Sequence, residues 1–127
     1  MLVWIEPFNS ENERVTCKYG FFVCKLADKS FSSPCNVEIT VMDTIEYSSV
    51  VLSEKEEYSA AYVNETNKLC TCMEAFEQEE DSALAWFRFD DLLIPITVTK
   101  DQRFNKFVGK YVVIKLNSII VYPYRMP

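Results

Sequence analysis

Strict alternation along residues 35–42 is the feature that most constrains how this chain folds. The apolar residues Val37, Ile39 and Val41 alternate with the polar residues Asn36, Glu38 and Thr40. Successive side chains of a β-strand point to opposite faces, so this segment places one face in a core and the other in water. The pattern predicts a strand.

Similar signals recur along the chain and predict an all-β, mainly antiparallel fold. Residues 15–26 are β-branched and aromatic, with a possible bend at Gly20, and the Asp-, Ser- and Pro-containing stretch 27–34 favours antiparallel pairing with 35–42. Residues 2–5 suggest a short edge strand that stops before Pro7. Further strands are expected at 48–53, 58–63, 84–89, 92–99, 111–116 and 119–124.

Two segments of the chain also fit a helical pattern. Residues 69–76 alternate as a strand, whereas 73–87 also fit a helix, and we favour the strand. Residues 101–106 are polar and fit one turn of helix. At most one short helix is therefore expected.

The size and composition of the chain fit one globular domain over residues 1–127. The sequence is 49% hydrophobic and 14% aromatic, far from the composition of disordered chains. No stretch approaches the roughly 18 apolar residues of a membrane-spanning helix, and no basic region precedes the first apolar run. We expect an intracellular protein of the nucleus or cytoplasm, with no membrane partner.

The residue inventory argues against an enzyme. The chain has no histidine, which excludes serine–histidine and cysteine–histidine catalytic pairs. Two glycines cannot build a dinucleotide-binding or phosphate-binding loop. The five cysteines are odd in number and irregularly spaced, so we expect buried thiols and not a zinc site or a disulfide framework. No cofactor or metal is expected.

Charge is strongly segregated in a chain of net charge −6. Residues 38–91 hold fourteen acids and three bases, a local balance of −11. Residues 100–125 hold six bases, one acid and five aromatic rings, a balance of +5. The last segment is therefore the candidate surface for an acidic protein or a phosphate backbone.

The order of segments near the C-terminus resembles the second half of OB-fold domains of the replication-protein-A-like and telomere-end-binding type. An apolar strand at 92–98 and a polar connection lead to Val108 and Gly109, which match the pair that enters the next strand. Val112, Ile114 and Leu116 match its inward positions, and the resemblance covers about residues 84–125. It implies a small OB-like barrel, for which the alternative is a β-sandwich of seven to eight strands.

The resemblance also implies a binding face. OB barrels hold single strands by stacking bases on aromatic rings within a positive groove. The candidates for contact with nucleic acid or a protein partner are Trp86, Arg88, Arg103, Lys106, Lys110, Tyr111, Lys115, Tyr122, Tyr124 and Arg125.

The overall charge ranks the possible functions. A protein of net charge −6 repels a polyanion unless its basic residues gather on one surface. We therefore expect first a non-enzymatic OB-like module that binds protein partners in a larger protein or nucleoprotein complex, in telomere or genome maintenance. Direct single-stranded nucleic-acid binding by the basic aromatic C-terminal face is the alternative.

Overall fold

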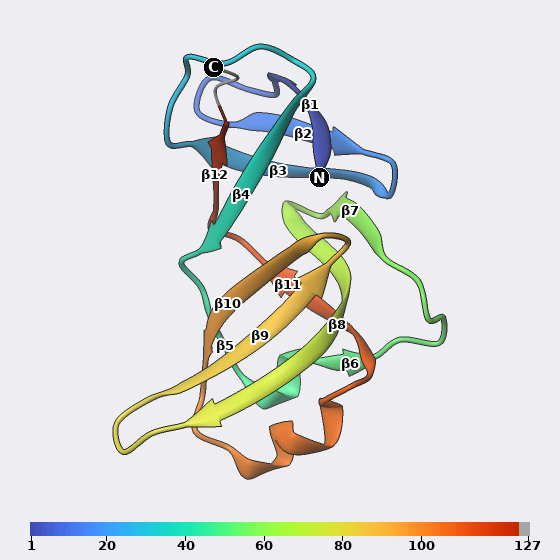
Figure 1. The fold of residues 1–127 in the computed structure, drawn as a ribbon, viewed down its shortest axis with the longest axis vertical. Coiled ribbons are helices and arrows are strands. Elements are labelled where there is room, and N and C mark those ends of the chain that lie inside the picture. The colour runs from blue at the N-terminus through green and yellow to red at the C-terminus, as the bar shows by residue number, and fades with distance from the viewer. Residues whose placement is uncertain (125–127) are drawn as a thin grey trace.

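The computed structural model describes residues 1–124 and has two lobes built almost wholly from strands (Figure 1). Most strand pairs are antiparallel, and within the described residues the helical elements are two short 3-10 helices. No helix there is long and apolar enough to cross a membrane. The elements are β1 (Leu2–Pro7), β2 (Glu13–Cys17), β3 (Gly20–Leu26), β4 (Cys35–Val41), β5 (Thr44–Ile45), η1 (Tyr47–Ser49), β6 (Val51–Leu52), β7 (Ser59–Val63), β8 (Thr66–Gln78), β9 (Ala83–Phe89), β10 (Leu92–Val98), η2 (Gln102–Phe107), β11 (Tyr111–Leu116) and β12 (Ile119–Pro123).

The upper lobe in Figure 1 is a closed ring formed by β1, β2, β3, β4 and β12. β1 pairs antiparallel with β2 and with β4, and β2 pairs antiparallel with β3. β12 closes the ring because it pairs antiparallel with β4 and parallel with β3. The order β1-β2-β3-β12-β4, with a parallel pair between its third and last strands in chain order, is that of an OB-like barrel.

The lower lobe is a second ring, inserted between β4 and β12. β8, β9 and β10 form an antiparallel meander, and β11 pairs antiparallel with β8. One interrupted strand lies across the remaining gap: β5 pairs parallel with β10, and β6 pairs antiparallel with β11. The helix η1 joins these two short strands. The second ring is therefore also closed. The interrupted strand that closes it, β5 with β6, precedes the meander of β8, β9 and β10 in sequence.

The predicted fold class, an all-β and mainly antiparallel small barrel, is confirmed. The expected turn of helix is present as η2. Residues 69–76, for which we favour a strand over a helix, lie in the long strand β8. The segment that resembles an OB fold, however, mostly does not build the OB-like ring. Of residues 84–125, β12 alone belongs to the first ring, whereas β9, β10 and β11 build the second.

Three local predictions near the N-terminus are wrong. Residues 15–26 form a hairpin of two strands, because the chain reverses just before Gly20. β3 and β4 are not neighbours, since β12 lies between them. The eight residues that join them exceed the two to five typical of hairpin loops. β1 is not an edge strand, because β2 and β4 pair along different parts of it.

Alternating burial along the strands builds the core. In β9, Ala83, Ala85, Phe87 and Phe89 are buried, and the side chains between them face outward. The buried apolar side chains of both rings form a single cluster. Its largest fully buried members are Phe22, Phe87, Phe89, Phe104, Leu69, Met73, Ile94, Ile96, Ile114, Leu116 and Ile119.

The two rings meet along the edge of β3 through a close backbone contact. The Ala60 amide of β7 donates to the Tyr19 carbonyl at 3.0 Å, and Gly20 pairs with Ala60. A Cβ atom on Gly20 would lie 2.0 Å from the Ala60 carbonyl oxygen, and the Gly20 φ is +129°. Glycine is required here on both counts.

The chain's two glycines give a matched test of this contact. Gly20→Ala is expected to lower the free energy of unfolding by more than about 3 kcal/mol, because steric overlap adds to backbone strain. Gly109→Ala is the control: its φ is +83°, but among residues 1–124 no heavy atom beyond its two chain neighbours lies within 4 Å of the added Cβ. Its expected cost is about 1–2 kcal/mol. Urea denaturation measures both, and equal costs would contradict the close approach.

A second stability prediction concerns Thr71, whose side chain faces the core of the second ring. Thr71 is fully buried, and its hydroxyl has no hydrogen-bond partner among residues 1–124. Thr71→Val removes an unpaired polar group and keeps the shape of the side chain. We expect the free energy of unfolding to rise by about 1 kcal/mol. A destabilised Thr71→Val variant in thermal denaturation would indicate that the hydroxyl has a partner.

Candidate functional site

The structure distributes the predicted site residues over several surfaces. Trp86 and Arg88 lie on the outer face of β9, where they alternate with the buried residues. Arg103 and Lys106 belong to η2, and Tyr122 lies on β12 in the other ring. Lys110, Tyr111 and Lys115 lie at or within β11, Tyr124 follows β12, and Arg125 lies outside the described residues.

Several of the basic side chains are engaged by their own neighbours. Arg103 makes an ion pair with Asp101 at 2.6 Å and lies 4.1 Å from the centre of the Tyr47 ring. The hydrogen bonds from Arg103 hold the pKa of Asp101 below its usual value. Lys106 also lies over Tyr47, at 4.8 Å, and Arg88 is paired with Glu74 at 2.5 Å. These charges therefore do not form one open positive groove.

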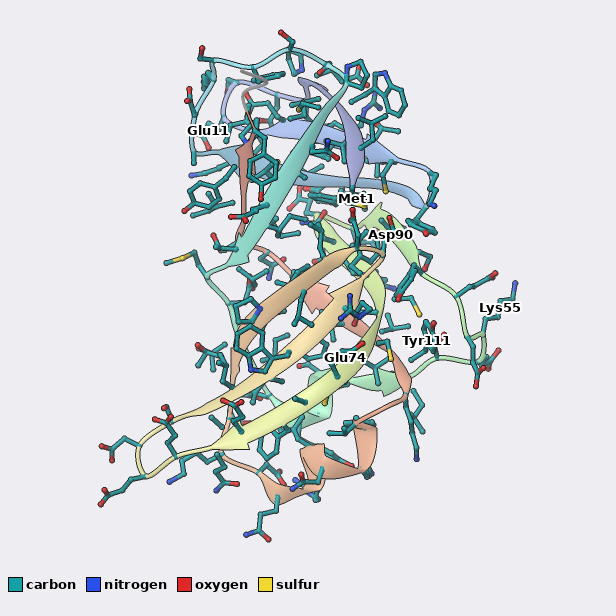
Figure 2. The ribbon with its side chains drawn as sticks, in the orientation of Figure 1. Met1, Glu11, Lys55, Glu74, Asp90 and Tyr111 are labelled. Atoms are coloured by element: carbon teal, nitrogen blue, oxygen red, sulfur yellow. The ribbon has the colours of Figure 1, made fainter. Side chains whose placement is uncertain are left out.

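The outer face of β8 and β11 carries an unusual pair of like charges. Lys68 and Lys115 lie directly opposite each other in the ladder, and both are exposed. Neither makes an ion pair within residues 1–124. Farther along the same strands, the ring of Tyr111 lies 5.6 Å from that of Tyr58 (Figure 2 labels Tyr111). This surface keeps two of the predicted candidates, Tyr111 and Lys115, on the same face of β11.

Charge reversal at this pair is expected to stabilise the fold. Lys115→Glu converts a repulsive cross-strand pair into an attractive one, worth about 0.2–1 kcal/mol. The double variant Lys68→Glu/Lys115→Glu restores like charges and should lose the gain. Thermal denaturation at low salt measures both effects, and high salt should reduce them. Identical stability of the single and double variants would show that the two side chains do not interact.

A cavity of about 310 Å³ lies where the two rings meet, and we call it the junction cavity. It is enclosed by β3, by the start of β12, by the turn between β7 and β8, and by the two crossings between the rings. Asp43 secures these crossings, because its carboxylate accepts from the amides of Asn117 and Ser118 at 3.0 and 2.8 Å. The cavity is lined by Asn12, Val23, Cys24, Lys25, Met42, Tyr62, Glu65, Asn67, Asn117, Ser118, Ile119 and Ile120.

Asn67 is the fixed polar element of the junction cavity. Its side chain is buried, with the residue 2% exposed. The Asn67 Oδ1 accepts from the Val23 amide at 2.8 Å, and its Nδ2 donates to the Val23 carbonyl at 2.9 Å. The side-chain amide of Asn67 thus makes the two hydrogen bonds with the backbone of β3 that a neighbouring strand would make. Sequence reasoning missed Asn67 because nothing local separates it from the adjacent polar residues of a turn.

The lining of the junction cavity is almost neutral. It contains one base, Lys25, and one acid, Glu65, among apolar side chains and uncharged amides and hydroxyls. No family model, curated protein or solved structure matches this chain. The kind of ligand that the junction cavity binds is therefore inferred from its lining residues and their contacts alone.

The cysteines are not placed for chemistry. Four of the five are buried, Cys72 is partly buried, and all are free thiols. Burial raises the pKa of Cys24 to about 12 and also raises the pKa of Cys17 and Cys72. A raised pKa disfavours the nucleophilic thiolate. Within residues 1–124, no three cysteines or carboxylates are grouped in a way that would hold a metal ion.

Proposed function

We propose that this protein is a non-enzymatic, OB-like interaction module that binds a protein partner at the junction cavity. The observation that carries the proposal is the position of this cavity on the first ring. OB barrels bind ligands on the face of their second and third strands and at the loops after the first and fourth strands. Here β3, Asn12 of the first loop, and Met42 and Ser118 at the ends of the inserted segment all line the cavity.

The border of the junction cavity suits a protein better than a polyanion. Met42, which lines it, is 69% exposed, and Val63, which follows the lining residue Tyr62 in the chain, is also exposed. Phe8 packs edge-on against the cavity residue Tyr62, with ring centres 5.4 Å apart. Exposed apolar groups around a pocket with a few fixed amides are typical of protein-binding surfaces. The ligand we expect is an apolar side chain together with the backbone that flanks it.

Single-stranded nucleic-acid binding is the second candidate, and the Lys68–Lys115 pair supports it. Within residues 1–124 neither lysine makes an ion pair, and the rings of Tyr111 and Tyr58 lie farther along the same face. Positive charge and stacking rings are the elements that such binding needs. Against it stand the acidic turn at Glu54, Glu56 and Glu57 and the net charge of −6. We rank it below protein binding for this reason.

The assembly we propose is an intracellular hetero-complex. An OB-like module with a neutral ligand cavity fits a subunit of a protein or nucleoprotein complex related to the replication-protein-A-like and telomere-end-binding group. This proposed relationship rests on the strand order of the first ring.

The proposal is tested by quantitative affinity purification of the tagged protein from cells that express it. Met42→Asp places a charge at the cavity border and should reduce recovery of a stoichiometric partner at least tenfold. Val51→Asp, at an exposed apolar residue away from the cavity, is the matched control and should retain the partner. Equal recovery with both variants, or no stoichiometric partner, would contradict the proposal.

The two candidates are separated by fluorescence-anisotropy titration against a labelled mixed-sequence single strand. Protein binding as the main function predicts no salt-sensitive affinity at low or moderate salt. Salt-sensitive binding that Lys115→Glu weakens would instead favour the nucleic-acid candidate.

A further inference from the structure

A groove of about 380 Å³ lies on the outer face of the second ring and shares no lining residue with the junction cavity. Three of its residues form one row across the sheet, because Val113 of β11 pairs with Val51 of β6 on one side and with Cys70 of β8 on the other. Ser59 of β7 extends this row, since it pairs with Cys70. We call this site the outer groove.

The outer groove has an apolar floor and a polar wall. Val51 and Leu52, which both line it, are 59% and 49% exposed. The wall is the loop between β6 and β7, which carries Lys55 (labelled in Figure 2). Exposed apolar side chains at a hollow of this kind are typical of a surface that receives an apolar side chain of another protein.

The next row of the same sheet face carries the Lys68–Lys115 pair. Lys115 lies two residues from Val113 along β11, and Lys68 lies two residues from Cys70 along β8. Residues two apart in a strand share a face and are separated by roughly 7 Å along it. The lysine pair and the apolar row are therefore neighbours on one continuous surface.

The Lys68–Lys115 pair favours an acidic group on a partner. Like charges directly opposite each other destabilise a β-sheet. Within residues 1–124 neither lysine makes an ion pair that would offset this repulsion. A carboxylate held over both ammonium groups removes the repulsion and gains two attractive contacts.

The surroundings of the lysine pair favour a single carboxylate over a phosphate backbone. A nucleic-acid strand carries a negative charge at every nucleotide, so its affinity depends on several bases. The outer groove beside the pair is lined by two acids, Glu54 and Glu57, and its one base, Lys55, lies 3.9 Å from Glu57. A polyanion that crossed both rows would meet these acids, whereas a segment with one acid over the lysines does not.

We propose that the outer groove and the Lys68–Lys115 pair together bind an extended segment of a protein partner with the pattern apolar-x-acidic. The apolar side chain fills the outer groove, and the Asp or Glu two residues away lies over the two lysines. This spacing matches the two rows, because side chains two apart in an extended segment also share a face. The inference goes beyond the proposed function, since it assigns a second segment to a separate surface.

The test is titration of the ¹⁵N-labelled full chain with synthetic capped peptides at low salt, followed by NMR. The probe is Ser-Leu-Thr-Glu-Thr-Leu-Ser, which reads the same in both directions and so serves either orientation of the bound segment. It should shift the amide signals of Val113 and Cys70 and bind about fivefold more tightly than the same peptide with Lys in place of Glu. Serine in place of both leucines should abolish binding, and high salt should reduce the preference for Glu.

Protein variants locate the site. Lys68→Glu/Lys115→Glu should reverse the preference, so that the Lys peptide binds more tightly than the Glu peptide. Lys25→Glu, the same change at the junction cavity, is the matched control and should leave the preference for Glu unchanged. Val51→Asp should weaken binding of the Glu peptide, because it places a charge in the apolar row.

Three results would overturn the inference: unshifted Val113 and Cys70 signals, an unchanged preference in the double lysine variant, or equal binding of the serine-substituted peptide. Salt-sensitive binding of a mixed-sequence single strand at the lysine pair, without peptide binding, would also overturn it and would support the nucleic-acid candidate. The proposed function fails separately, because Val51→Asp should lose the peptide and still retain the partner that Met42→Asp releases.

Discussion

The edge of β3 is the constraint on which the rest of the structure depends. Three unrelated partners complete it in succession: Ala60 of the inserted ring, the side chain of Asn67, and β12. None of the three is adjacent to β3 in sequence. An unpaired backbone edge in a buried position is costly, so the insertion and the C-terminal strand both stabilise the first ring by completing this edge.

This arrangement explains why the two rings share one core and why the junction cavity lies between them. The chain leaves the first ring after β4 and returns at β12, and Asp43 ties the two crossings together. The junction cavity lies beside these crossings. It is a product of the insertion, since Tyr62, Glu65 and Asn67 of the inserted segment form part of its lining.

The sequence alone predicted the strands better than their partners. Alternation identified β4, and apolar periodicity identified β9, β10, β11 and β12, because these signals are local. Their pairing depends on segments that are far apart in sequence. β12 lies between β3 and β4, whereas the local sequence pattern predicted that these two strands pair with each other. The pair Val108 and Gly109 does lead into a barrel strand, but the strand belongs to the inserted ring.

The candidate site was harder to predict for the same reason. Local charge pointed to the C-terminal segment, yet Arg103 of η2 is paired with Asp101, and the predicted candidate Arg88 on β9 is paired with Glu74. The residues that shape the junction cavity, Asn67 above all, become distinctive only when β8 is brought against β3. Such a contact has no signature in the order of the amino acids.

The most direct test of this account is amide hydrogen exchange at Val23, compared between the wild type and Asn67→Ala. The account predicts that the Val23 amide of the wild type is as protected as a paired amide of β2, and that in Asn67→Ala it exchanges much faster while the β2 amides stay protected. Rapid exchange of Val23 in the wild type, or protection that does not change in the variant, would contradict the claim that Asn67 completes the edge of β3.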